Sequence, residues 1–390
     1  MNNNALKNGY QINNPYGNFF ICVLDTFLSL SAKRKLKNFL IPKPRKILIS
    51  NGAHMGDVVI ATSILPVFKK AFPEAKIGML VGSWALQVIK GHPQIEWIHV
   101  VDHWKINRAK KNIFSKYKNY IKTAKEALKE IKKINYDVAV DLYSFFPNNI
   151  PLLYRAGIPV RIGYKSGGFG PLLTHALDWQ PGKHEAEYHA DLLRFLGITK
   201  FDSLKPNLPP VSPKAEKELA DFLTLYDLKK KSYIVMHPGA GSKIKEWPVE
   251  KWRELLNLLE PQNKKIIITG VASENELIEK IISGFPNCIN ACGKLSWQGF
   301  VALIKNALFL YSVDSVAGHI AAAVDTPGII IASGINDMNR WRPYNKLIKV
   351  ISNNIPCAPC FKNSGCSNMI CLNEIMIREV FHFGVPENEN

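Results

Sequence analysis

The stretch from Tyr311 to Ala332 carries residues that suit the binding of an anion. Its first apolar run ends in Asp314 and Ser315, whose side-chain oxygens can accept hydrogen bonds from the free amides of a following helix. Gly318 lets a ligand approach the backbone, and His319 adds a polar donor on the same turn. Because unpaired N–H groups and the positive end of the dipole meet at a helix start, we expect a phosphate pocket there. An ordinary strand-to-helix crossover explains the same pattern.

A second small-residue loop follows an earlier apolar strand. It runs from His237 through Gly239 to Ser242, and Lys243 and Lys245 come directly after it. A loop of this kind, with lysines at its end, is what a phosphate cradle needs. It is neither a Walker motif nor a G-x-G-x-x-G fingerprint. Because glycine loops between strands and helices are common, the loop alone does not decide the function.

Glu274 stands just past the end of the next strand, in the sequence GVASE. A carboxylate at this place can accept hydrogen bonds from both hydroxyls of a ribose, as in dinucleotide-binding folds. A glutamate favoured by the dipole of the helix that it precedes is the alternative explanation. Two phosphate-type loops and a ribose-type carboxylate in one half of the chain together suggest a nucleotide.

The elements that position these residues alternate between strands and helices in both halves. We expect strands at 46–50, 77–81, 98–101, 137–142 and 161–164, and again at 233–236, 265–269, 307–313 and 328–332. Helical spacing covers 58–71, 122–133, 186–196, 249–259, 273–283, 297–304 and 316–324. Such alternation predicts an α/β protein with two doubly wound, Rossmann-like parallel sheets, and a cleft where ligands bind beyond the carboxyl ends of the strands.

A proline-rich stretch separates the two halves, and it sets the expected domain boundaries. We expect an N-terminal amphipathic and basic extension over 1–45, a first domain over 46–205, a linker over 206–213 and a second domain over 214–390. The 390-residue length suits two domains better than one core.

The charge of the chain predicts an anionic partner. The formal net charge is +18, which suits nucleic acid, an acidic membrane surface or a phosphorylated substrate. Much of this charge lies between Lys105 and Lys133, which is either a binding face or a solvated helix surface. Seven cysteines are too few for a disulfide scaffold of this length, so a reducing cytosol is expected.

The extension contains an apolar run, Phe19 to Leu30, interrupted by Asp25 and followed by a basic stretch, Lys33 to Lys37. Such a combination can lie in a membrane interface, with the apolar part in the headgroup boundary and the cations on anionic lipid. A first helix packed on the protein itself is the alternative. No run is long enough to span a bilayer, and the start of the chain lacks the pattern of a secretory signal.

Four motifs in order resemble glycosyltransferase family 9, the family of lipopolysaccharide heptosyltransferases. They are MGDVVIATSILPVFKKAFP, HPGAGSKIKEWP, GVASE and VDSVAGHIAAAVDTP, and RWRPY at 340–344 and the late cysteine cluster add to the likeness. The resemblance spans residues 46 to about 375. It implies a GT-B fold and transfer of a sugar, typically heptose from ADP-heptose, with inversion at the anomeric carbon.

The resemblance also implies roles for individual residues. Asp57, in the MGD loop, would be the general base that takes the acceptor hydroxyl proton, and Lys245, in the K-x-W-P motif, would neutralise the departing diphosphate. The donor site would comprise His237, Gly239, Ser242, Glu274, Asp314, Ser315, Gly318 and His319. The acceptor would be an anionic, lipid-linked glycan, and the enzyme would work in the cytoplasm at the inner face of the membrane. His54 and Met55 stand in a loop that varies in the family, and Glu246 stands where a basic or aromatic residue is often found, so the donor sugar stays open.

We expect neither a metal nor another cofactor. The chain has no D-x-D triplet, which many sugar transferases use to hold a divalent cation, so Lys245 and the helix dipole would do that work. The one cysteine cluster comprises Cys357, Cys360, Cys366 and Cys371. It could bind zinc, or hold free thiols or a local disulfide.

Two other classes of protein fit single features of the chain. A nicotinamide-dependent oxidoreductase is disfavoured because no G-x-G-x-x-G opens either half. A nucleotide-binding or nucleic-acid-binding basic protein without enzymatic activity is suggested by the charge alone. Nucleic-acid binding would need aromatic residues interleaved with the basic run, and only Tyr117 and Tyr120 offer that. A family 9 transferase that uses another nucleotide sugar is a further alternative.

Overall fold

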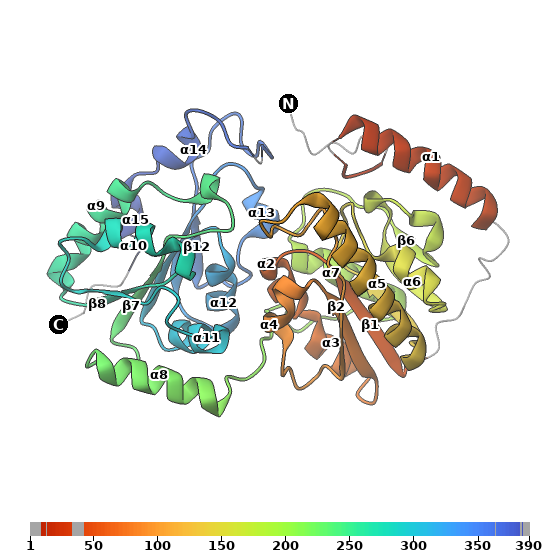
Figure 1. Cartoon of the computed structure of the whole chain (residues 1–390), viewed down its shortest axis with the longest axis horizontal. Coiled ribbons are helices and arrows are strands. Elements are labelled where there is room, and N and C mark those ends of the chain that lie inside the picture. The colour runs from red at the N-terminus through yellow and green to blue at the C-terminus, as the bar shows by residue number, and fades with distance from the viewer. Residues whose placement is uncertain (1–8, 13, 33–42, 363, 383, 385–390) are drawn as a thin grey trace. The chain divides into compact units, whose positions relative to one another are not determined.

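The computed structural model describes residues 9–12, 14–32, 43–362, 364–382 and 384. The chain divides into two compact units, residues 2–209 and 210–390. Figure 1 shows that each unit is a sheet flanked by helices. The division falls after Pro209, inside the proline-rich stretch 206–213. The basic stretch from Lys33 to Lys37 lies outside the described residues.

The N-terminal unit contains a six-stranded sheet. Its strands are β1 (Lys46–Asn51), β2 (Lys76–Val81), β3 (Trp97–Val100), β4 (Val138–Asp141), β5 (Val160–Tyr164) and β6 (His175–Leu177). Its helices are α1 (Pro15–Ala32), α2 (Met55–Ala61), α3 (Ile64–Ala71), α4 (Leu86–Ile89), α5 (Ile113–Ile134), α6 (Ile150–Arg155) and α7 (Glu185–Leu193).

The C-terminal unit contains a second six-stranded sheet. Its strands are β7 (Tyr233–His237), β8 (Lys265–Ile268), β9 (Cys288–Asn290), β10 (Phe309–Val313), β11 (Gly328–Ile331) and β12 (Ile348–Ile351). Its helices are α8 (Pro213–Leu225), α9 (Val249–Leu259), α10 (Asn275–Ile282), α11 (Trp297–Lys305), α12 (Val316–Val324), α13 (Met338–Trp341), α14 (Ile370–Asn373) and α15 (Ile377–His382).

Both sheets have the same topology. The order in the first is β3-β2-β1-β4-β5-β6, and the second, taken from its other edge, is β9-β8-β7-β10-β11-β12. Every strand pair is parallel. This is the doubly wound Rossmann order, in which the direction of winding reverses between the first and fourth strands. Two such domains make up the GT-B fold, so the predicted fold class is confirmed.

The core of the C-terminal unit follows from the two-residue period of its strands. Alternate residues such as Ile234 and Met236 on β7, and Ile266 and Ile268 on β8, face one hydrophobic cluster. Helices α9, α10 and α15 cover that cluster with their own apolar sides. In the N-terminal unit, residues of α5 and α6 cover one face of the sheet in the same way, through Ala127, Ile131 and Leu153.

The expected helix over 58–71 is two helices. α2 ends at Ala61 and α3 begins at Ile64. Pro66 has no N–H to donate to the preceding turn, so it is accommodated only in the first turn of a new helix. The Thr62 hydroxyl donates to the Val59 carbonyl at 2.6 Å and closes the end of α2. The break ends α2 one turn after Asp57.

Candidate active site

The predicted donor residues gather where the second sheet reverses its winding. β7 ends at His237 and is followed by the loop that leads to Lys245, while β10 ends at Val313 and is followed by Asp314. The two strands are direct neighbours in the sheet. Because parallel strands end at the same edge, both loops lie beyond the carboxyl ends of the strands at the switch point, where doubly wound folds bind ligands.

Lys245 and Asp314 form an ion pair between these two loops. The lysine Nζ lies 2.6 Å from the Asp314 Oδ2, and both side chains are largely buried. The Asn336 side-chain amide donates to the same oxygen at 3.0 Å. Burial by itself would raise the pKa of Asp314, but the Lys245 ammonium outweighs it and holds the pKa below its ordinary value. The Asp314 carboxyl group therefore stays ionised at neutral pH.

The tryptophan of the K-x-W-P motif holds the loop in place. Trp247 is buried and packs edge-on against Trp252 of α9, with ring centroids 5.3 Å apart. The loop before it makes one 3-10 turn, in which the Lys245 N–H donates to the Ser242 carbonyl at 3.0 Å. The buried ring fixes the backbone two residues after Lys245, so the lysine projects from a supported position rather than from a free loop.

Ser315, and not Asp314, caps helix α12. The Ser315 hydroxyl accepts from the Ala317 N–H at 3.3 Å, while Asp314 is turned towards Lys245. Helix α12 packs closely on the sheet at Gly318, where a Cβ would lie 2.6 Å from Ile330 of β11. His319 is buried one residue further along the same turn. The start of α12 thus sits tightly on the sheet, beside the ion pair.

His237 offers a hydrogen-bond acceptor rather than a positive charge. Its Nδ1 lies 2.9 Å from the Thr269 hydroxyl oxygen, and that hydroxyl donates to the Met236 carbonyl at 3.1 Å. Since a hydroxyl has one hydrogen, we assign the Nδ1 as the donor and the Nε2 as the bearer of the lone pair. Burial lowers the pKa of His237 to about 4, so the ring is neutral at physiological pH.

Glu274 lies directly over the glycine loop. A Cβ on Gly239 would lie 2.2 Å from the Glu274 carboxylate, so a larger residue there would force that carboxylate to move. One carboxylate oxygen accepts from the Val271 N–H at 2.8 Å. Burial raises the pKa of Glu274, and burial together with the negative charge of Glu274 raises the pKa of Glu246. Neither carboxylate charge is fully stabilised by the protein groups around it, so both carboxylates are suited to accept hydrogen bonds from the hydroxyl groups of a ligand.

Asp57 occupies the corresponding place in the N-terminal unit. β1 ends at Asn51, and the loop that follows enters α2 so that Asp57 lies in its first turn. The carboxylate Oδ2 accepts from the His54 N–H at 3.0 Å. This N–H and the positive end of the helix dipole both stabilise a negative charge there. A half-buried, oriented carboxylate beyond a strand end has the form of a general base.

The sequence analysis did not identify a second carboxyl group at this switch point, and this one is fully buried. Asp141 ends β4, the direct neighbour of β1, and its Oδ2 accepts from the Asn149 N–H at 3.0 Å. The Asn149 amide in turn donates to the Ser50 hydroxyl at 3.0 Å. Burial raises the pKa of Asp141 to about 7. The signal was present in DVAVDL, where a second aspartate stands at the end of an apolar strand.

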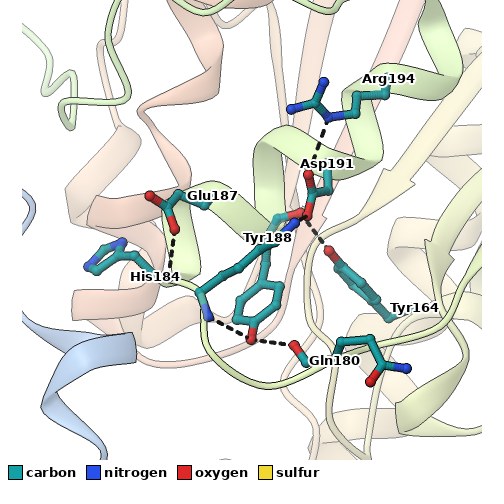
Figure 2. A network of polar contacts seen from close by, with 8 residues as sticks. Tyr164, Gln180, His184, Glu187, Tyr188, Asp191 and Arg194 are labelled. Atoms are coloured by element: carbon teal, nitrogen blue, oxygen red, sulfur yellow. Dashed lines mark hydrogen bonds and ion pairs between the residues drawn. The ribbon is translucent and has the colours of Figure 1, made fainter.

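Helix α7 packs against α2 and α3 and is held by its own polar network (Figure 2). The Tyr164 hydroxyl donates to the Tyr188 carbonyl at 2.8 Å, and the Tyr188 hydroxyl donates to the Gln180 carbonyl at 2.6 Å. The Glu187 carboxylate accepts from the His184 N–H at 3.0 Å. These bonds join β5, the loop before α7 and α7 itself, and so tie the helix that packs against α2 to the sheet.

The four late cysteines line one small cavity of about 30 Å³. All four thiols are free in this structure. Within the described part of the chain, no three or more histidine, cysteine or acidic side chains are grouped closely enough to hold a metal ion. The cavity borders Gly334, just after β11.

Comparisons with known proteins agree with this geometry. Lipopolysaccharide heptosyltransferase 3 of Escherichia coli K12 is 28% identical over 305 residues, 75% of this chain and 83% of that protein. A glycosyltransferase family 9 structure from Veillonella parvula has a TM-score of 0.69 at 20% identity, covering 79% of this chain and 85% of the other. The E. coli heptosyltransferase WaaC, solved with ADP, has a TM-score of 0.62 at 23% identity, covering 78% of this chain and 92% of the other.

The model of glycosyltransferase family 9 (heptosyltransferase) matches residues 125–369, more than half of the chain. The match includes Lys245, Glu274 and the start of α12. With the sheet topology and the polar groups at both switch points, it shows that this chain is a glycosyltransferase and belongs to family 9, the heptosyltransferase family.

Proposed function

We propose that the protein transfers a heptose from ADP-heptose to a lipopolysaccharide core or a related lipid-linked glycan, with inversion and without a metal ion. The observation that carries this proposal is the Lys245–Asp314 pair beside the start of α12, at the switch point of the second sheet. A lysine, a helix start and a nearby ribose-type carboxylate suit a nucleoside diphosphate. Relatives named as lipopolysaccharide heptosyltransferases support heptose as the sugar and lipopolysaccharide as the acceptor, and a similar structure named as an ADP-heptose heptosyltransferase supports the donor.

The reaction is a single displacement. The acceptor oxygen attacks the anomeric carbon from the face opposite the diphosphate, the bond from that carbon to the phosphate oxygen breaks, and ADP leaves. Asp57 takes the proton of the acceptor hydroxyl. Lys245 and the N–H groups at the start of α12 stabilise the negative charge that develops on the leaving diphosphate.

The remaining donor residues bind the nucleoside. Glu274 accepts hydrogen bonds from the ribose hydroxyls, for which its poorly compensated charge is suited. His237 accepts one hydrogen bond through its Nε2, from a hydroxyl or an amino group. An enzyme that acts on a lipid-linked acceptor would lie at the cytoplasmic face of the inner membrane, and this is the location that we propose.

The test is a transfer assay with purified protein, ADP-heptose and a deacylated core acceptor. Mass spectrometry detects the added heptose, and the coupling constant of the new anomeric proton gives its configuration. The same assay in EDTA tests metal independence, which fails if EDTA abolishes transfer and added Mn²⁺ restores it. Thermal shifts with ADP, UDP and GDP test the nucleotide, because a ligand that binds only the native state raises the melting temperature. Stabilisation by UDP or GDP but not by ADP would refute the donor assignment.

A further inference from the structure

Helix α1 presents two sides of opposite character. Its inner side packs on the N-terminal unit through Asn18, Ile21 and Asp25, which are nearly inaccessible to solvent. Its outer side consists of large apolar side chains at helical spacing, namely Tyr16, Phe19, Phe20, Val23, Phe27 and Leu30. Phe19, Phe27 and Leu30 are each exposed by about two thirds of their surface, and Tyr16 more. An exposed stripe of this size marks an interaction site.

The inner side fixes α1 firmly. The Asp25 carboxylate accepts from the Phe169 N–H at 2.9 Å and from the Tyr10 hydroxyl at 3.0 Å. Ile21 lies against Gly168, where any side chain would clash with it. Figure 1 shows α1 at the outside of the unit, beyond α6 and β6. The helix is therefore a docked element with a fixed outer face, and not a flexible tether.

A second helix of the same unit repeats the pattern. The first turns of α5 expose Ile113, Phe114, Tyr117 and Ile121. Exposed lysines stand next to these residues, among them Lys118 and Lys122. Over its whole length α5 carries seven lysines and two glutamates. Aromatic and aliphatic side chains bordered by lysines are the composition of surfaces that lie in a membrane interface.

We propose that the outer face of α1 inserts into the headgroup boundary of an anionic lipid bilayer. Charge decides between a bilayer and a second protein surface. The outer face of α1 bears no charge at neutral pH, because Asp25, the one Asp, Glu, Lys or Arg residue of the helix, points inward. Basic residues follow α1 directly in the sequence, and α5 contributes further lysines. An anionic bilayer would attract these cations, which are neighbours of the apolar residues in the sequence.

No helix in the described ranges is long and apolar enough to cross a bilayer. The attachment that we propose is peripheral and reversible, by insertion of aromatic side chains together with electrostatic attraction. This inference deepens the proposed function, because a lipid-linked acceptor lies in the same surface. It does not depend on which sugar is transferred, so the two can fail separately.

The experiment measures co-sedimentation of the full-length protein with vesicles. One set contains phosphatidylethanolamine and phosphatidylglycerol, and the other contains phosphatidylcholine alone. The variant F19S/F27S removes two exposed rings of α1, and L225S/M376S is the matched control, since Leu225 and Met376 are equally exposed in the other unit. We expect F19S/F27S to lose at least about 10-fold in partitioning to anionic vesicles, and the control to bind like the wild type.

The same samples include the readouts that would overturn the proposal. Activity on a deacylated acceptor should be unchanged in F19S/F27S, which separates lost docking from lost folding. Equal vesicle binding by the wild type and F19S/F27S would mean that charge alone attaches the protein, and would refute insertion of α1. A wild-type dimer that F19S/F27S converts to a monomer, with no vesicle binding by either, would assign the face to a second copy of the chain.

Discussion

The two units share one sheet topology but carry different polar side chains at its switch point. In the C-terminal unit, the loops after β7 and β10 carry an ion pair, and two carboxylates with raised pKa values lie close by. In the N-terminal unit, the same two positions carry Asp57 and the buried Asp141, held by backbone N–H groups. The first arrangement suits a charged diphosphate and a ribose. The second suits proton transfer from a neutral hydroxyl, so the same sheet topology carries two different sets of polar groups.

The substitution D57N should have the largest effect, because it removes the only proposed base. Asparagine keeps an oxygen that accepts from the His54 N–H, so α2 should still form. We expect kcat to fall about 10²-fold to 10⁴-fold. Because Asp57 and the nucleotide-binding residues lie in different units, ADP binding measured by calorimetry should be nearly unchanged. Full activity of D57N would remove Asp57 from the mechanism.

Loss of Lys245 should come next. The variant K245M alone would leave Asp314 buried without its cation, so K245M/D314N is the cleaner change and D314N its control. We expect K245M/D314N to slow transfer by about 10²-fold to 10³-fold. Affinity should fall more for ADP than for AMP, since only ADP carries the leaving diphosphate. Equal losses for both nucleotides would place the lysine away from the β-phosphate.

Glu274 should affect binding more than turnover. Hydrogen bonds to a charged acceptor contribute more binding free energy than bonds to a neutral one, so we expect E274Q to weaken ADP binding about 10-fold to 100-fold. Burial raises the pKa of Glu274, so the carboxylate is lost at a higher pH than for an ordinary glutamate. Wild-type affinity should therefore fall as the pH decreases, relative to E274Q, in calorimetric titrations. Parallel pH profiles, or an equal response of both proteins to 2′-deoxy-ADP, would contradict the ribose contact.

His237 should give the smallest effect. H237F keeps a ring against Phe300 but lacks the acceptor nitrogen, and we expect ADP to bind about 2-fold to 10-fold more weakly. Nitrogen NMR should find the proton on Nδ1 and no titration between pH 6 and 8, because burial lowers the pKa of His237 to about 4. An imidazolium that titrates near pH 6.5 would disprove the acceptor role.

The strands with long apolar runs were predictable from the sequence, and α9 and α12 have the expected limits. The short edge strands β6, β9 and β12 were not predicted. β6 and β9 have only three residues each, too few to display a period, so the neighbouring strand in the sheet determines their conformation. The break after Ala61 was missed because apolar spacing continues across it, although Pro66 marked the place.

For the site, the sequence identified residue types and strand ends but not their pairing. Asp314 and Ser315 were interchangeable as caps, and only the approach of Lys245, from a loop 69 residues away, assigns them different tasks. Gly318 was expected to let a ligand approach the backbone, whereas the Ile330 side chain occupies the space where a Cβ of residue 318 would lie. Partners this distant in the chain cannot be read from local patterns. The roles of Asp57 and Lys245 in catalysis stay predictions.

The Lys245–Asp314 pair has a consequence for turnover. If Lys245 binds the donor diphosphate as proposed, Asp314 competes with that diphosphate for the same ammonium group. This competition would lower the affinity for the donor and for ADP alike, because the ion pair must separate before either diphosphate can bind the lysine. When ADP leaves, the ion pair can form again, which favours release of the product. An aspartate that opposes donor binding would in this way also help each catalytic cycle to finish.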